Sequence, residues 1–271
     1  MSGWAARWNL APSFQKLPSL AHISPSVIAA ESIWFILGAL TAKNLTGNYE
    51  SMMVAWPDID TVMFDMDGTL LDLHFDNFFW HKLVPEHFSK QHGVSKEQAL
   101  AHMQSKSAEV YGTLDWYSID YWQAELKLDI PRLKCLITDK IRLRPGAEQL
   151  LKALVGEGKQ VLLVTNAHPI SLQFKMQHVS IEKYFEQLIS SHQLKKAKEN
   201  DGFWESLKQL FSYDPTRTAL FDDNLSVLRQ AHREGIAHLR AIKQPDSQQP
   251  FLPVAEFPQV EDLGLIAPDE C

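Results

Sequence analysis

Cysteine is almost absent from this sequence of 271 residues, in which only Cys135 and the terminal Cys271 occur. Two cysteines, one of them at the chain end, do not provide a disulfide framework. Such sparse use is typical of proteins in a reducing compartment. We therefore expect a cytoplasmic protein without structural disulfides.

A surplus of positive charge is also missing. The 26 lysines and arginines face 33 aspartates and glutamates, which gives a formal net charge of -7. Because proteins that bind nucleic acid normally present a basic surface, we expect no nucleic-acid partner. An anionic small molecule is still compatible with this charge, since local side chains and a bound cation determine its binding. The oligomeric state does not follow from these features.

A hydrophobic run of membrane-spanning length is missing as well. The apolar stretch at residues 27–42 is interrupted by Glu31 and is shorter than the ~20 residues that a span needs. We expect residues 1–54 to be a poorly ordered extension, with Met52 or Met53 as an alternative start, and we expect no membrane partner. A non-enzymatic, membrane-associated protein that uses residues 27–42 is the alternative.

Apolar runs typical of buried strands alternate with helical patterns from residue 61 onward. The strand-like runs are 61–65, 160–168, 185–191, 217–223 and 236–242. Helical patterns fall at 144–160, 169–178, 198–211 and 224–235. This alternation predicts βα units and an α/β fold, with a doubly wound parallel sheet covered by helices on both faces.

Residues 74–142 lie between the first and second predicted strands and contain aromatic, helical sequence. This block is too long for a simple crossover, so we expect it to be an inserted, all-helical cap domain. The core domain would then comprise residues 55–73 and 143–245, with a C-terminal segment at 246–271. The Gln- and Pro-rich stretch at 243–253 indicates a loose surface segment.

Four short polar motifs come just after predicted strands, where open parallel sheets place their ligand crevice. They are Asp65-Met66-Asp67-Gly68-Thr69, Thr165-Asn166, Lys198 and Asp222-Asp223. Each alone has a plain alternative, as a turn, a helix cap or a solvated lysine. In this order, all four resemble the motifs of the haloacid dehalogenase-like (HAD) hydrolases, mostly Mg²⁺-dependent phosphatases. The resemblance implies a Rossmann-like HAD core with strand order 3-2-1-4-5 and a cap inserted after strand 1.

The first motif supplies two carboxylates with different roles. A carboxylate can attack phosphorus to give an aspartyl-phosphate, and the resemblance assigns this attack to Asp65. A second carboxylate can protonate the leaving alkoxide and later activate water, a role that falls to Asp67. Halide needs no proton, so the presence of Asp67 favours phosphoester hydrolysis over dehalogenation. Gly68 allows close approach of the backbone to phosphate, and Thr69 can hydrogen-bond within the loop.

Positive charge is needed because an anionic nucleophile and a phosphate dianion repel each other. At an effective dielectric constant of 20, each pair of unit charges about 4 Å apart costs about 4 kcal/mol. Lys198 supplies one positive charge, and Mg²⁺ held by oxygen ligands supplies two more. The resemblance implies a role for each remaining motif residue. The metal ligands would be the Asp65 carboxylate, the Asp67 carbonyl and Asp223, with Asp222 supporting through water, and Thr165 and the main chain of Asn166 would hold the transferred oxygens.

Substrate specificity is expected to come from the cap, which closes over the crevice. Within residues 112–126, Trp116, Tyr117 and Asp120 mix aromatic and acidic groups on helical spacing. Either these aromatics form the core of the cap, or they sandwich a nucleobase while the acid binds its N–H edge. His168 either faces the substrate or only shapes a helix start.

Three longer stretches narrow the resemblance. They are "DMDGTLLDLHFDNFFWHKLVPE", "LDWYSIDYW" and "TNAHP", and they resemble the proteobacterial GMP/IMP nucleotidases over roughly residues 55 to 245. This resemblance implies a Mg²⁺-dependent purine 5′-nucleotidase that acts on a nucleoside monophosphate. A phosphatase for another small ester, such as a sugar phosphate or phosphoglycolate, and a phosphomutase are the alternatives.

Overall fold

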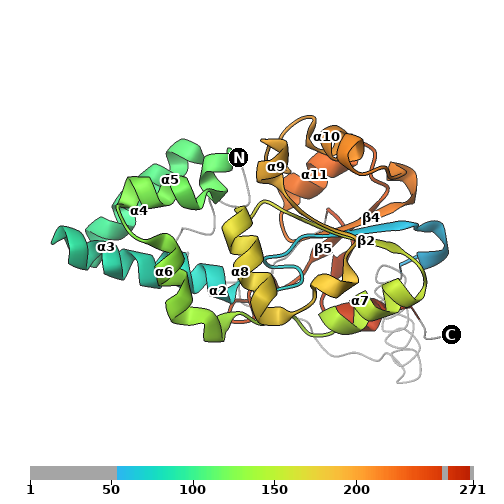
Figure 1. Cartoon of the computed structure of the whole chain (residues 1–271), viewed down its shortest axis with the longest axis horizontal. Helices are drawn as coiled ribbons and strands as arrows, with labels where there is room; N and C mark the ends of the chain where they lie inside the picture. The colour runs from blue at the N-terminus through green and yellow to red at the C-terminus, as the bar shows by residue number, and fades with distance from the viewer. Residues whose placement is uncertain (1–53, 252–255, 269–271) are drawn as a thin grey trace, which may run out of the picture. The chain divides into compact units, whose positions relative to one another are not determined.

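The computed structural model describes residues 54–251 and 256–268 (Figure 1). The expected N-terminal extension at 1–54, which includes the apolar stretch 27–42, lies outside the described residues except for Val54. Within the described ranges, no helix is both long enough and apolar enough to cross a membrane.

A parallel sheet of six strands forms the centre of the fold, in the order β3-β2-β1-β4-β5-β6. All neighbouring strands run parallel. The strands are β1 (Thr61–Phe64), β2 (Gln160–Thr165), β3 (Gln187–Ser190), β4 (Thr218–Asp222), β5 (His238–Ile242) and β6 (Gln259–Val260). The predicted α/β class and the order 3-2-1-4-5 are therefore confirmed, and β6 extends the sheet at one edge.

Helices cover both faces of this sheet. The core helices are α7 (Ala147–Gly156), α8 (Pro169–Val179), α9 (Ser191–Leu194), α10 (Phe203–Leu210) and α11 (Leu225–Arg233). Single 3-10 turns are η2 (Trp56–Asp58), η6 (Glu182–Tyr184), η7 (Pro215–Arg217) and η8 (Leu263–Ile266). Side chains of α7 and α8 pack in one apolar cluster, and those of α10 and α11 pack in another on the opposite face (Figure 1).

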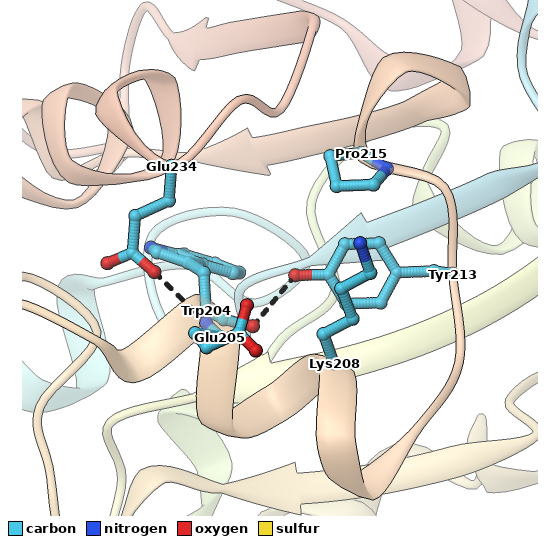
Figure 2. A pocket seen from close by; sticks show the side chains of 6 residues that line it. All are labelled: Trp204, Glu205, Lys208, Tyr213, Pro215 and Glu234. Atoms are coloured by element: carbon cyan, nitrogen blue, oxygen red, sulfur yellow. Dashed lines mark hydrogen bonds between the residues drawn. The ribbon is translucent and has the colours of Figure 1, made fainter.

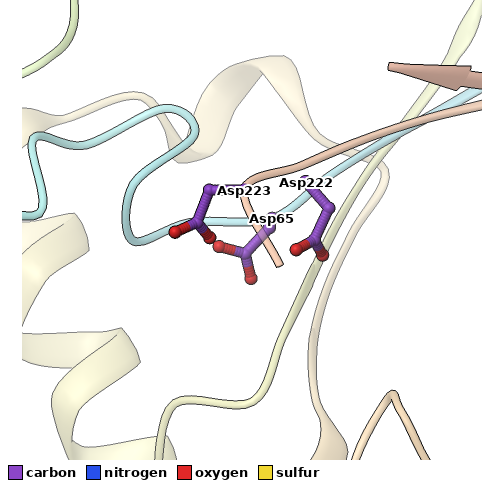
Figure 3. A group of neighbouring side chains, drawn as sticks. All are labelled: Asp65, Asp222 and Asp223. Carbon is purple, nitrogen blue, oxygen red and sulfur yellow. The ribbon is translucent and has the colours of Figure 1, made fainter. Parts of the chain in front are cut away.

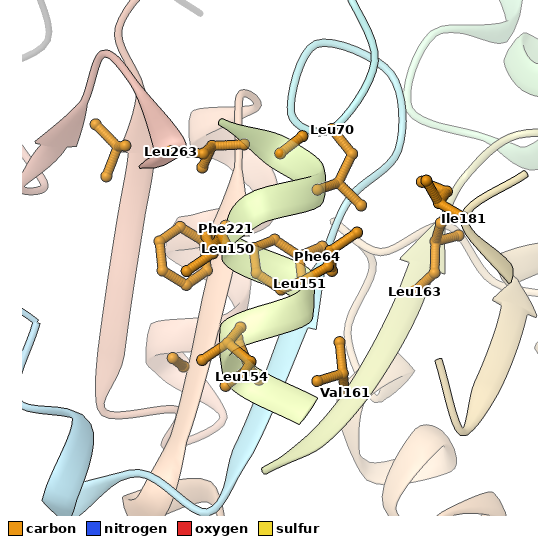
Figure 4. Packing of buried hydrophobic residues seen from close by; sticks show 14 of the residues in the cluster. Phe64, Leu70, Leu150, Leu151, Leu154, Val161, Leu163, Ile181, Phe221 and Leu263 are labelled. Carbon is orange, nitrogen blue, oxygen red and sulfur yellow. The ribbon is translucent and has the colours of Figure 1, made fainter. Parts of the chain in front are cut away.

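Strand β1 is buried on both sides because its side chains alternate between these two clusters. Phe64 packs with Leu150 and Leu151 of α7 (Figure 4), whereas Met63 belongs to the cluster of α10 and α11. A strand covered on both faces has no need of polar positions, which explains the continuous apolar run in the sequence.

The helices between β1 and β2 form a bundle with its own apolar cluster, which contains Phe79, Trp122 and Leu126. They are α2 (His74–Phe78), the π-helix η3 (Phe79–Leu83), α3 (Val84–His92), α4 (Lys96–Val110), η4 (Leu114–Tyr117), α5 (Ile119–Leu126), α6 (Ile130–Lys134) and η5 (Cys135–Lys140). Helix α4 begins with a capping box, in which Ser95 and Gln98 satisfy each other's backbone N–H groups. We refer to residues 74–142 as the cap.

One predicted helix is shorter than expected. The pattern at 198–211 predicts a helix throughout, but α10 begins only at Phe203, after Gly202 with a φ of 74°. The backbone N–H of Lys198 binds the side chain of Asn166 at 2.9 Å instead. Lys198 therefore lies in a loop, and this loop turns its side chain into the protein.

Candidate active site

The register of the sheet brings the predicted motifs to one edge. Phe64, the last residue of β1, pairs with Leu163 of β2 and with Phe221 of β4. Because these strands are parallel, the residues that follow them emerge at the same side. Asp65 directly follows β1 and Asp222 ends β4, so their side chains meet there.

Three carboxylates and one ammonium form the centre of the site. Oxygen atoms of Asp65, Asp222 and Asp223 all lie within 4.8 Å of one another (Figure 3). Lys198 is 1% exposed, and its Nζ lies 2.5 Å from Asp65 Oδ1 and 2.7 Å from Asp222 Oδ2. We call these four residues the acid cluster.

The acid cluster holds more negative than positive charge, since three carboxylates face one ammonium. Burial raises the pKa of Asp65 to about 6, because the attraction of Lys198 does not fully offset desolvation and Asp222 adds repulsion. Burial also raises the pKa of Asp222 despite its contact with Lys198. Burial alone would lower the pKa of Lys198, but the two carboxylates outweigh it and raise that pKa.

This donor set fits a divalent cation such as Mg²⁺, which prefers hard oxygen ligands. Two further positive charges would balance the three carboxylates and the single ammonium. Gly68 has a φ of 91°, and a Cβ atom on it would lie 2.7 Å from Asp223 Cγ. Only glycine therefore lets the first motif approach Asp223 so closely. Thr69 is fully buried, and its hydroxyl has no hydrogen-bond partner among the described residues.

The motif after β2 shapes the backbone around the site. Thr165 Oγ1 accepts a hydrogen bond from the N–H of Ala167 at 3.1 Å. Asn166 accepts from the Lys198 N–H through Oδ1 and donates to Glu199 Oε2 at 2.8 Å through Nδ2. The Asn166 side chain thus holds the loop that carries Lys198.

Two of the predicted cap residues reach the core. Tyr117 donates its hydroxyl proton to Glu199 Oε1 at 2.8 Å, and burial together with the Glu199 charge raises the pKa of Tyr117. Asp120 Oδ2 lies 3.5 Å from Nε2 of His168. His168 also accepts a hydrogen bond from the N–H of Ile170 at the start of α8, so it shapes a helix start and faces the cap at once. These contacts join cap and core beside the acid cluster.

Trp116 lies differently from its two neighbours. Its ring packs edge-on against Tyr111 within the cap, and its carbonyl accepts a hydrogen bond from the Trp122 indole at 2.9 Å. The structure therefore brings Tyr117 and Asp120 to the core but shows Trp116 in contacts with other cap residues.

A second group of charges surrounds Asp67. Lys175 Nζ lies 2.6 Å from Asp67 Oδ1 and 2.6 Å from Asp76 Oδ2, and Lys134 Nζ lies 3.4 Å from Asp76 Oδ1. We call these four residues the lysine–aspartate chain. Burial and the nearby Asp76 charge raise the pKa of Asp67 to about 7, against the opposing effect of Lys175.

Of the other members of this chain, Asp76 and Lys175 have pKa values that favour their charged forms, whereas Lys134 does not. Burial alone would raise the pKa of Asp76, but Lys175 and Lys134 outweigh burial and lower it. Burial alone would lower the pKa of Lys175, but Asp67 and Asp76 outweigh burial and raise it. For Lys134 the burial effect prevails and lowers the pKa.

Sequence reasoning missed Lys175, Asp76, Lys134 and Glu199. A signal for Lys175 was present, because it lies on the apolar side of α8 with Leu172 and Met176, which are also buried. A lysine at such a position must pair with a buried acid or lose its charge. The two acids that it pairs with are far away in the sequence, Asp67 in the first motif and Asp76 in the cap, so local patterns do not reveal them.

The start of the loop between β5 and β6 packs beside the first motif, which corrects the expectation of a loose surface segment at 243–253 for residues 243–246; residues 247–251 are exposed as expected, and 252 and 253 lie outside the described residues. Arg144 donates to the carbonyl groups of Gln244 and Pro245, and Pro245 accepts from the N–H of Leu73 at 2.9 Å. Asp246 is 4% exposed and binds the side chain of Asn77 at 2.7 Å. Residues 244–246 are therefore part of the wall around the site.

A surface pocket lies elsewhere on the core, beside α10 (Figure 2). Its lining contains none of the predicted site residues and comprises Trp204, Glu205, Lys208, Tyr213, Pro215 and Glu234. The acid cluster, not this pocket, therefore carries the chemistry discussed below.

The fold, the site and the similarities described next together define a hydrolase of phosphoric monoesters with a parallel, Rossmann-like sheet. Residues 59–229 match the sequence pattern of the haloacid dehalogenase-like hydrolases, and the chain belongs to this family. The family resemblance predicted from the four motifs is thus confirmed.

The chain is similar to several known members. It is 36% identical over 215 residues to "GMP/IMP nucleotidase YrfG" of Escherichia coli (strain K12), covering 79% of this chain and 97% of that protein. It is 19% identical over 193 residues to the "Phosphorylated carbohydrates phosphatase" of Thermotoga maritima, covering 68% and 85% of the two chains. A crystal structure of a HAD phosphatase from Thermococcus onnurineus shares the fold, with a TM-score of 0.63, 19% identity, and coverage of 76% and 94%.

Proposed function

We propose that this chain is a Mg²⁺-dependent purine 5′-nucleotidase that hydrolyses GMP and IMP through an aspartyl-phosphate. The observation that carries the proposal is the acid cluster at the strand ends, with Asp67 of the same loop beside it. The choice of substrate is supported by the 36% identity to a GMP/IMP nucleotidase over most of both chains.

In the first half-reaction, the Asp65 carboxylate attacks phosphorus and forms a new P–O bond. The bond from phosphorus to the 5′ oxygen breaks, and Asp67 donates a proton to the departing alkoxide, which leaves as the nucleoside. Lys198 offsets the negative charge of the nucleophile at a distance of 2.5 Å. Thr165 and the backbone N–H at Asn166 would hold the transferred oxygens, and Gly68 and Thr69 would shape the loop around them.

In the second half-reaction, Asp67 takes a proton from a water molecule that attacks phosphorus of the aspartyl-phosphate. The bond between phosphorus and Asp65 then breaks, so that inorganic phosphate leaves and both carboxyl groups return to their starting states. When bound, Mg²⁺ would neutralise charge on the phosphoryl oxygens as a Lewis acid. The Asp65 and Asp223 carboxylates and the Asp67 carbonyl would hold it, with Asp222 in support.

Recognition of the base is assigned to the side of the cap that meets the core. Tyr117 and Asp120 lie there, opposite Glu199 and His168. An aromatic ring and polar groups of this kind suit a flat purine with a hydrogen-bonding edge. Trp116 would contribute only if it left its present contact with Tyr111. A cytoplasmic location, expected from the cysteine content, stays a prediction.

The proposal is tested with a panel of phosphate esters assayed in the presence of Mg²⁺. We expect kcat/KM for GMP and IMP to exceed that for sugar phosphates and phosphoglycolate by at least about tenfold, because differential contacts to the base are worth more than about 1.4 kcal/mol. Similar or higher values for sugar phosphates would instead support the alternative that the Thermotoga maritima relative illustrates. An isomerised product that depends on a bis-phosphate would identify a phosphomutase.

A further inference from the structure

Lys175 is a buried lysine whose ammonium group contacts the carboxylate that we propose as general acid. It lies on core helix α8, is 1% exposed, and has its Nζ 2.6 Å from Asp67 Oδ1. On its other side, Asp76 of cap helix α2 lies 2.6 Å away. Lys134 of cap helix α6 completes the chain at 3.4 Å from Asp76. The chain thus begins in the core and ends in the cap.

The surroundings of this chain are apolar. Lys175 Nζ lies 4.9 Å from the centre of the Phe75 ring, and Lys134 Nζ lies 4.7 Å from that of Phe79. Taking an ammonium group out of water costs several kcal/mol, and a buried ion pair often gives no net gain in stability. Cation–π contacts and the paired charges reduce that cost. Stability alone therefore does not explain why Lys175 is here.

We propose that Lys175 is the positioning residue for Asp67, with its ammonium group held from the far side by Asp76. The inference rests on the proposed function, in which Asp67 hands a proton to the leaving oxygen as the P–O bond breaks. A general acid has to lie within about 2.6–3.2 Å of the atom that it protonates. Lys175 fixes the Asp67 carboxyl group by a short contact, and Asp76 keeps the ammonium from turning away. Because Asp76 and Lys134 belong to the cap, the arrangement is complete only when cap and core meet.

The test compares two esters that differ in their need for a proton. A nucleoside 5′-monophosphate releases a poor leaving group, an alkoxide, whereas 4-nitrophenyl phosphate releases a stabilised anion that departs unprotonated. We expect Lys175→Met to lower kcat/KM for the nucleotide by about 10–100-fold, since a displacement of about 1 Å costs on that order. For 4-nitrophenyl phosphate we expect a loss of less than about threefold, because proton donation no longer limits the reaction.

The matched control is Lys134→Met, which removes an equally buried ammonium from the same chain without touching Asp67. Its effect should be the same on both esters. If Lys175→Met also lowers both values equally, Lys175 has only a structural role and the inference is wrong. The variant Asp65→Asn tests the proposed function separately from the role of Lys175. It should lose its activity, and retained activity would overturn the proposed function itself.

Asp76→Asn keeps the inference testable if Lys175→Met does not fold, as judged by thermal unfolding. This variant leaves Lys175 and Asp67 unchanged but removes the negative charge of the second partner of the ammonium group. We expect the same selective loss with the nucleotide as for Lys175→Met, but a smaller one. Lys175→Arg should retain part of the activity that Lys175→Met loses. Equal losses with both esters in Asp76→Asn would contradict the inference.

Discussion

Replacing the proposed nucleophile should make the metal-free protein more stable while it abolishes turnover. Asp65 is 6% exposed and shares the acid cluster with two other carboxylates. Its pKa is raised from an ordinary value of 3.8 to about 6, chiefly by burial. The folded state therefore disfavours the charged carboxylate that is present at neutral pH. Asp65→Asn removes this charge with a side chain of nearly the same shape.

The expected gain in the free energy of unfolding follows from the rise in the pKa of Asp65. A rise of about two pKa units corresponds to about 3 kcal/mol, at about 1.4 kcal/mol per unit. The variant also loses the attraction between Asp65 and Lys198, although Asp222 still holds that lysine at 2.7 Å. We therefore expect a gain of about 1–3 kcal/mol in the free energy of unfolding. For a domain of this size, each kcal/mol moves Tm by about 2–4 °C.

The gain in stability of Asp65→Asn over the wild type should depend on pH. A carboxyl group with a raised pKa destabilises the folded state fully above its folded value, here about 6, and not at all below its unfolded value of 3.8. The advantage of Asp65→Asn should thus be largest at neutral pH and shrink as the pH falls through this window. Added Mg²⁺ should reverse the order, because it binds the wild-type carboxylate and stabilises the folded state.

The assay is thermal unfolding of both proteins in a chelating agent and then in Mg²⁺, at neutral and acidic pH. Asp60→Asn is the matched control, since Asp60 pairs with Arg217 near the opposite end of β1 and has a lowered pKa. That variant should gain no stability at neutral pH. If Asp65→Asn proves less stable than the wild type in the chelating agent at neutral pH, the reasoning about surplus negative charge is refuted.

Three further predictions concern the cap, the first motif and the metal. Tyr117→Phe removes the hydrogen bond to Glu199, and a bond of this kind to a charged acceptor is worth about 1.5–3 kcal/mol. In steady-state assays, this variant should raise KM more than it lowers kcat. Gly68→Ala forces a Cβ atom against Asp223 and should raise the Mg²⁺ concentration for half-maximal rate by about 10–100-fold. In the wild type, that concentration should rise as the pH falls below about 6, because Asp65 must lose its proton to bind a cation.

The pattern of the sequence was sufficient to predict a parallel sheet with the acidic motifs at its strand ends, and the resemblance to the family supplied the order of the strands and the grouping of the acid cluster. Apolar runs without polar positions identify strands covered on two faces. Parallel strands leave the sheet at the same edge, so Asp65 and Asp222 had to meet once their strands were neighbours. The sequence pattern does not predict strand β6, because its two residues, Gln259 and Val260, are too few to show a period.

Contacts between cap and core could not be predicted in the same way. Tyr117 and Glu199 are separated by 82 positions, and Lys175 and Asp76 by 99. Such pairs depend on the orientation of one folded unit against another, which no local period encodes. The pattern at 198–211 predicts a helix at Lys198 for a related reason, since the loop found there is held by a hydrogen bond that the Lys198 N–H donates to the side chain of the distant Asn166.

The acid cluster and the lysine–aspartate chain differ in their balance of positive and negative charge, and this difference suits them to different roles. The lysine–aspartate chain pairs two lysines with two aspartates, so that each lysine has a carboxyl partner and the chain needs no added cation. The acid cluster contains three carboxylates and one ammonium, a set that would suit a cation and, through it, the phosphate of the proposed substrate. A balanced group suits the fixing of a proton donor, and an unbalanced group suits the binding of charged reactants. Neutralising Asp65 of the acid cluster should therefore stabilise the folded protein at neutral pH, whereas neutralising Asp76 of the lysine–aspartate chain, whose pKa is lowered, should destabilise it.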